Sequence, residues 1–235
     1  MPDFSRRSTE EEMMDDFSLG HNIIDPIMDE LEVVNVMLGG YRVFLDAFDT
    51  IKLKDGMSIS DWGCGGGDSL RYIALWARKK NLKLNLVGID ATAAAIEYAR
   101  DKSAEFPEIS YRLSDVISDD LKTNQFDVVI SSLFTHHFKT PDWIKLIQKM
   151  TDCASTAVIV NDLHRHWFAY YSIGLLTSIF SKSEMVKHDS KVSVLRSFNK
   201  DDIVSMLRAA RIKDYTVKWM WAFRWQICID STKRT

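Results

Sequence analysis

The middle of the chain alternates between short apolar runs and segments whose apolar residues recur every three or four positions. The apolar runs have the length of strands and lie at residues 57–62, 84–90, 109–115, 126–133 and 154–161. Segments with helical spacing follow several of them, at residues 69–79, 93–102 and 141–150. The run FDVVISSL at 126–133 is rich in β-branched residues, as is typical of a strand buried on both faces. Strands that alternate with helices form a parallel sheet with helices on both faces, so we predict an α/β fold.

The residues before this alternation predict a helical preface over 1–50. Ser8 and Thr9 precede three glutamates, which is typical of a helix N-terminus. Asp25-Pro26 predicts the start of a second helix, because proline is tolerated in the first turn, and Gly39-Gly40 predicts its end. The preface either packs on the domain or covers a site, and we favour packing.

The pattern changes again after residue 163. Residues rich in aromatic, serine and histidine side chains predict a helical insertion, and Asn199 predicts the N-cap of a further helix. Alternating apolar positions between 217 and 229 predict two antiparallel strands with a break near Trp221-Ala222. We predict a single domain over 1–235, whose parts are the preface 1–50, a core 57–163, an insertion or lid 164–190, and a C-terminal helix and hairpin 199–230.

Composition narrows the class of partner and the compartment. The formal net charge of -3 and the pI of about 6.1 lack the basic signature of a nucleic-acid-binding domain, so we expect no nucleic-acid partner. Three widely spaced cysteines, Cys64, Cys153 and Cys228, form neither a zinc motif nor a disulfide framework, which favours a reducing compartment. Neither a secretory leader nor a membrane-spanning run is evident. We therefore expect a cytoplasmic protein without a membrane span.

The candidate chemistry begins at the end of the first predicted strand, where the sequence DWGCGGGD occupies residues 61–68. Glycines before a helix let backbone N–H groups approach a nucleotide-like ligand. A dinucleotide fingerprint would need its third glycine at Asp68, which argues against a nicotinamide oxidoreductase. Asp90 ends the second strand and is placed to accept from a ribose diol. Asp115 ends the third strand, where it either accepts a hydrogen bond from an adenine amino group or caps the N-terminus of the next helix.

These motifs resemble those of class I S-adenosylmethionine-dependent methyltransferases. Residues 61–67 resemble the first motif of that family, 87–90 its ribose-binding strand, 114–116 its adenine site and 126–131 its fourth motif. The resemblance implies a Rossmann-like seven-stranded sheet, mostly parallel with one antiparallel strand. It also implies S-adenosyl-L-methionine as cofactor and S-adenosyl-L-homocysteine as product.

The resemblance also implies which residues contact the cofactor. From the methionine portion through the ribose to the adenine, these residues are Asp61, Gly63, Cys64, Gly65, Asp90, Ala91, Asp115 and Val116. Ser131 and Leu133 follow the fourth strand into the site. Arg42 is a further candidate, which either pairs with the methionine carboxylate or lies on the surface.

The preface and the sequence DLHRH at 162–166 resemble bacterial methyltransferases that act on quinones and aromatic polyketides. This narrower resemblance implies O-methylation of a small aromatic acceptor. Histidine suits the removal of a phenolic proton, because its pKa lies near neutrality. His136 and His137 follow the fourth strand, and His164 and His166 follow the fifth. We predict His137 and His166 as catalytic, with capping or packing as the competing interpretation for each.

We predict no metal ligands, and three alternative functions remain open. A metal-assisted catechol mechanism would want acids at the ends of the fourth and fifth strands, but Ser131-Ser132 occupy the fourth. The Asn/Asp-Pro-Pro-aromatic signature of enzymes that methylate amino groups of nucleic acids is also absent. The alternatives are a cofactor-binding protein that acts through a partner without catalysis, a methyltransferase of macromolecules, and a nicotinamide oxidoreductase.

Overall fold

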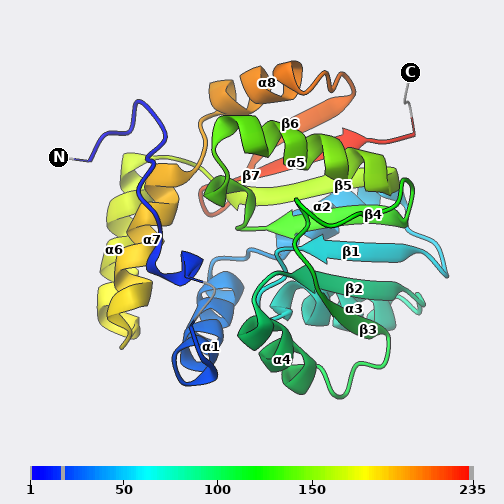
Figure 1. Ribbon diagram of the computed structural model, residues 1–235, viewed down its shortest axis with the longest axis horizontal. Coiled ribbons are helices and arrows are strands. Elements are labelled where there is room, and N and C mark those ends of the chain that lie inside the picture. Colours follow the sequence, from blue (N-terminus) through cyan, green and yellow to red (C-terminus); the bar gives the residue numbers. More distant parts are fainter. Residues whose placement is uncertain (1, 17–18, 233–235) are drawn as a thin grey trace.

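The computed structural model describes residues 2–16 and 19–232 and contains one seven-stranded sheet in the order β3-β2-β1-β4-β5-β7-β6 (Figure 1). The strands are β1 (Ser58–Trp62), β2 (Asn85–Asp90), β3 (Ile109–Leu113), β4 (Phe126–Ser132), β5 (Ala154–Leu163), β6 (Tyr215–Met220) and β7 (Arg224–Asp230). Neighbouring strands from β3 to β5 pair in parallel, and β7 pairs antiparallel with both β5 and β6. The predicted fold, a mostly parallel sheet of seven strands with one antiparallel strand, is confirmed.

Helices cover both faces of this sheet, as the sequence predicts. On one face α2 (Arg42–Ile51) and α3 (Asp68–Lys79) pack on side chains such as Ile59 and Ile130. On the other face α5 (Thr140–Cys153) and α8 (Lys200–Ala209) pack on Val129, Val158 and Ile227. Each helix contributes one apolar stripe, which the alternating faces of the strands bury in two separate cores. The helix α4 (Ala93–Lys102) connects β2 to β3.

The remaining helices gather beyond the ends of the parallel strands. α1 (His21–Met37), α6 (Trp167–Phe180) and α7 (Glu184–Arg196) stand together beside the carboxyl edge of the sheet, where β1 and β4 point (Figure 1). Two single 3₁₀ turns, η1 (Met13–Asp15) and η2 (Thr135–His137), lie in the same region. Open parallel sheets bind ligands at this edge. None of the helices in the described ranges is long and apolar enough to cross a membrane.

The N-terminal segment differs from its prediction. Residues 8–12 form no helix, and only the short η1 turn follows them. The Ser8 N–H donates to the Leu195 carbonyl, and the N–H groups of Met13 and Met14 donate to the Asp189 carboxylate on α7. The prediction of a helix here was wrong, because these tertiary hydrogen bonds take the backbone donors that a helix would have used.

The second helix starts earlier than predicted and ends where expected. α1 begins at His21 instead of Asp25, and Pro26 lies inside it. The helix ends at Met37, and Gly39 then adopts a left-handed conformation with φ of 65°. Glycine reaches this conformation without a steric penalty, so the predicted stop is confirmed.

Candidate functional site

A cavity of about 800 Å³ opens at the carboxyl edge of the sheet. One half is lined by the glycine turn after β1 together with Asp90, and the other half by the N-terminal segment, the loop after β4 and α7. Binding sites for small molecules fall in the range of about 300–1,000 Å³. The volume therefore suits two small ligands side by side or one larger one.

The glycine turn is shaped to bring its backbone to the cavity. Gly63 has φ of 69° and Gly67, the N-cap of α3, has φ of 74°. The N–H of Gly63 donates to the Ile89 carbonyl, which ties the turn to β2. The Asp90 carboxylate accepts from the N–H of Gly65 at 2.9 Å and from the N–H of Thr92 at 2.8 Å. The second strand thus holds the turn in place through one side chain.

Three acids border this half of the cavity, and within the described ranges only Asp68 among them is partly balanced, by the buried Arg224. Asp61 is buried, and Asp68 and Asp90 lie near enough to raise its pKa further. Burial is the larger cause, and together the effects hold the pKa of Asp61 well above its usual range. None of the three forms an ion pair within the described part of the chain, and Asp61 Oδ1 has no hydrogen-bond donor there. A cationic ligand would relieve this repulsion.

The thiol of Cys64 belongs to the same turn and is unreactive by its surroundings. Its side chain is buried, and burial together with the charge of Asp90 raises its pKa well above the usual range. A nucleophilic cysteine needs the opposite environment, because the thiolate is the reactive form. Cys64 therefore acts as a small side chain that lines the cavity.

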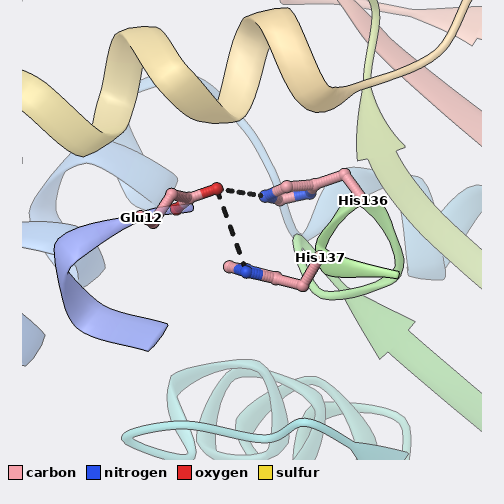
Figure 2. A group of neighbouring side chains, drawn as sticks. All are labelled: Glu12, His136 and His137. Carbon is pink, nitrogen blue, oxygen red and sulfur yellow. Dashed lines mark ion pairs between the residues drawn. The ribbon is translucent and has the colours of Figure 1, made fainter. Parts of the chain in front are cut away.

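The other half of the cavity carries a histidine pair from η2. His136 is buried, and its Nδ1 lies 2.7 Å from Asp162 Oδ1 at the end of β5. The His137 ring stacks on it at 4.4 Å between ring centroids, and His137 Nδ1 lies 2.7 Å from Asp15 Oδ1. Glu12, which comes from the N-terminal segment, points at both rings (Figure 2). Burial alone would lower the pKa of His136, but Asp162 and Glu12 raise it to about 9.

The cavity brings together only some of the residues that the sequence predicts. Those that line it are Asp61, Gly63, Cys64, Gly65, Asp90, Leu133 and His137. Asp115 and Val116 lie beyond its wall, and the Asp115 carboxylate accepts from the Ile117 N–H and the Ser118 hydroxyl.

The other predicted residues face elsewhere. The Ser131 hydroxyl is buried and donates to the Trp62 carbonyl. Arg42 and Ala91 are exposed outside the cavity. His166 is the N-cap of α6, where its Nδ1 accepts from the Phe168 N–H, and its ring stacks on Phe223. A capping role accounts for His166 in this position.

His164 provides a test of electrostatics away from the cavity. Burial, with smaller contributions from His166 and Arg165, lowers the pKa of His164 to about 4, while the unfolded value is 6.5. Between these values the unfolded chain binds a proton that the folded chain excludes, so stability falls as pH drops from 6.5 towards 4. Because the side chain is only partly buried, we expect a loss of about 1 kcal/mol between pH 7 and pH 5 from this residue.

His164→Gln should remove that part of the loss, since glutamine retains an acceptor for the Trp219 indole N–H, which lies 3.3 Å from His164 Nδ1. Urea unfolding of both proteins at pH 7 and pH 5 measures the difference. Equal losses in the two proteins would contradict the prediction.

Residues 59–157 match the family model described as a methyltransferase domain. This segment, which is less than half of the chain, is similar to methyltransferase domains. It extends from β1 to the first four residues of β5, and therefore contains the glycine turn and both acid-tipped strands. Phosphoethanolamine N-methyltransferase 3 of Arabidopsis thaliana is 28% identical over 97 residues, which are 41% of this chain and 19% of that relative. The chain thus spans about a fifth of the length of the curated relative.

Solved structures extend the likeness to the whole fold. A protein of Methanococcus maripaludis classed as an S-adenosyl-L-methionine-dependent methyltransferase has a TM-score of 0.66 at 13% identity, over 97% of this chain and 99% of that one. A SAM-dependent methyltransferase from Aquifex aeolicus has a TM-score of 0.58 at 16% identity, over 78% and 87%. The plantazolicin methyltransferase BpumL has a TM-score of 0.58 at 22% identity, over 77% and 66%. The fold is that of S-adenosylmethionine-dependent methyltransferases.

Proposed function

We propose that the protein transfers a methyl group from S-adenosylmethionine to a small molecule. The observation that carries this proposal is the set of neighbouring acids beside the glycine turn, Asp61, Asp68 and Asp90. S-adenosylmethionine has a sulfonium, an ammonium and a carboxylate, with a net positive charge, and a ribose diol that donates hydrogen bonds. Opposite charge within a few ångströms stabilises ionised acids, so a cationic cofactor would relieve the repulsion among these side chains.

Along this edge of the sheet, Asp61 and the glycine turn would hold the methionine portion, and Asp90 would accept hydrogen bonds from the ribose. Asp115 and Val116, which lie beyond the cavity wall, would contact the adenine only where it passes that wall. This path leaves the half of the cavity with the histidine pair for the acceptor.

The acceptor half favours a small and uncharged or cationic molecule. The acceptor half contains four acids, Glu11, Glu12, Asp15 and Asp189, and three cations, Arg7, Lys139 and Arg196. Arg196 already pairs with Asp15 at 2.5 Å, and Arg7 donates to the carbonyls of His136 and Phe138. A phosphate ester such as phosphoethanolamine would meet these acids with its own negative charge. The N-terminal segment and α7 line the same half, so a macromolecular acceptor would have to displace them.

A phenol, hydroxyquinone or aromatic polyketide fits these requirements, and O-methylation is the reaction that a neighbouring histidine pair suits. Phe134 and Phe138 line the acceptor half and offer apolar surface to an aromatic ring. Among the two predicted catalytic histidines, His137 is the one that lines this half, so we place the removal of the acceptor proton there.

Labelled S-adenosylmethionine and a panel of phenols and hydroxyquinones test the proposal, with phosphoethanolamine as the comparison acceptor. We expect label in at least one phenol or hydroxyquinone and none in phosphoethanolamine. Transfer only to proteins or RNA would contradict the small-molecule acceptor. Tight binding of S-adenosylmethionine without turnover of any acceptor would instead favour a cofactor-binding protein that acts through a partner.

A further inference from the structure

We propose that Glu12, His136 and His137 form a binding site for a divalent first-row transition-metal cation at the acceptor end of the cavity. One carboxylate oxygen and two imidazole nitrogens from these residues lie within 4.8 Å of one another. Figure 2 shows the carboxylate of Glu12 aimed between the two stacked rings. The three residues come from the N-terminal segment and from η2, which the fold brings together across the carboxyl edge of the sheet.

The separations of these atoms fit a shared ion better than hydrogen bonds. Metal–nitrogen and metal–oxygen bonds of about 2.0–2.2 Å place ligand atoms about 3.3–3.6 Å apart around a tetrahedral ion. Glu12 Oε1 lies 3.4 Å from His136 Nε2 and 3.9 Å from His137 Nδ1. The first distance falls within that range, and the second exceeds it by a few tenths of an ångström. The His137 ring must turn away from Asp15 to close the difference.

The two best-buried ligand atoms lack hydrogen-bond donors in the described part of the chain, although the Arg196 guanidinium forms an ion pair with Glu12 Oε1 at 3.6 Å. Glu12 is 5% exposed and His136 is 2% exposed, yet Glu12 Oε1 and His136 Nε2 lack a hydrogen-bond partner among the described residues. Buried polar atoms without partners are costly, and they mark places where an ion or a water is expected. A cation between these two atoms satisfies both at once.

The surroundings orient the ligands as they do in metal sites. Asp162 accepts from His136 at Nδ1, which leaves the lone pair of Nε2 for an ion. Such a carboxylate behind a ligating histidine fixes the tautomer and increases the basicity of the ring. Glu12 is held by its other oxygen, Oε2, which accepts from the Ser193 hydroxyl at 2.8 Å. Asp15 Oδ1 lies 2.7 Å from His137 Nδ1, which is too close for both atoms to bind one tetrahedral ion, so this contact must open for His137 to bind the ion.

The donor set of two imidazoles and one carboxylate indicates which metals the site would bind. This donor set occurs at zinc sites and at non-haem iron sites, whereas magnesium and calcium prefer oxygen ligands alone. The role of the ion rests on the proposed function, although its binding does not. A cation here would lower the pKa of an acceptor hydroxyl that approaches it, and His137 would then serve as a ligand instead of taking the proton directly.

Metal content of tag-free protein measures the site without any assay of methyl transfer. The protein is stripped with a chelator, dialysed against Zn²⁺, Co²⁺ or Mn²⁺, and analysed by mass spectrometry for metal per chain. We expect one Zn²⁺ or Co²⁺ per chain and weaker retention of Mn²⁺. Glu12→Gln and His137→Gln should each lower the Zn²⁺ affinity by roughly 10- to 100-fold, as the loss of groups at metal sites commonly does.

A second cluster of one histidine and two carboxylates provides the matched control. His21 lies within 3.4 Å of Asp25 and 2.7 Å of Glu97, but all three side chains are exposed. His21→Gln should leave the stoichiometry and affinity unchanged, since an exposed cluster holds an ion loosely. Circular dichroism checks that each variant is folded, and Co²⁺ absorption of the folded variants reports loss of the ligand field.

Failure to retain any of the three metals would overturn the proposal and leave His136 as a proton bridge between Glu12 and Asp162. Retention that is equal in the wild type and Glu12→Gln, or that is lost in His21→Gln, would overturn it as well. Binding of S-adenosylhomocysteine to the chelator-treated protein tests the proposed function separately. The two proposals can therefore fail independently.

Discussion

Asp90→Asn should weaken the binding of S-adenosylhomocysteine by about 100-fold or more, because each hydrogen bond to a charged group contributes about 1.5–3 kcal/mol and a ribose diol makes two. The same carboxylate accepts from the N–H groups of Gly65 and Thr92. An asparagine amide presents one acceptor oxygen and one donor nitrogen, so one of these backbone donors would face another donor. Isothermal titration with S-adenosylhomocysteine measures the affinity.

Asp55 offers a matched control at the opposite edge of the sheet. Its carboxylate also accepts from a backbone N–H, that of Lys83 at 2.9 Å, but it lies outside the cavity. Asp55→Asn should therefore leave the affinity for S-adenosylhomocysteine unchanged. If Asp90→Asn binds within about threefold of the wild type while urea unfolding shows both proteins folded, Asp90 does not contact the ribose.

The fold could be predicted from sequence because its elements carry local periodic signals. The β-branched run of β4 predicts a strand, and the apolar stripe of α5 predicts a helix, without reference to the rest of the chain. Strands and helices that alternate in this way are compatible with only a few sheet topologies. The antiparallel pair β6 and β7 was also readable from alternation, although neither glycine nor asparagine marks the turn between them. Patterns of this kind need no knowledge of distant contacts.

The N-terminal segment could not be predicted in the same way. A cap such as Ser8 contributes about 1 kcal/mol to a helix, and hydrogen bonds to α7 outweigh that preference. Glu12 and Asp15 therefore contact the histidine pair, which is more than 120 residues away in the sequence. The local sequence pattern predicts for them only the role of acids near a helix N-terminus. The glycine turn and Asp90 are close in sequence and were predicted as cofactor contacts. The acceptor half joins three distant segments, and only His137 was predicted there as catalytic, while Leu133 was predicted as a cofactor contact.

The prediction of no metal rested on acids at the ends of the fourth and fifth strands, because Ser131-Ser132 stand at the end of the fourth where a carboxylate would be needed. In the folded chain a carboxylate arrives instead from Glu12, which belongs to neither strand. Ligand sets that combine a loop with a remote segment leave no spacing in the sequence by which they could be recognised.

Gly63→Ala should lower the free energy of unfolding by about 2–5 kcal/mol, from about 1–2 kcal/mol of left-handed backbone strain and about 1–3 kcal/mol of overpacking. The φ of Gly63 is 69°, and a Cβ built there would lie 2.2 Å from the Phe134 ring. That ring is packed against Phe138, with 5.0 Å between ring centroids, so it would have to move into the cavity that it lines. Urea unfolding followed by circular dichroism measures the loss.

Gly56→Ala separates the two causes. Gly56 has φ of 83°, but a Cβ there meets no atom within 4 Å, so only the backbone strain of about 1–2 kcal/mol should appear. Equal losses at the two glycines would mean that contact with Phe134 contributes nothing. If the contact matters, Gly63→Ala should cost less in a Phe134→Ala background than in the wild type, because the cavity left by the ring accommodates the added methyl group. In the Phe134→Ala background the remaining loss of stability in Gly63→Ala measures the left-handed backbone strain of the turn, because the clash with the ring is removed.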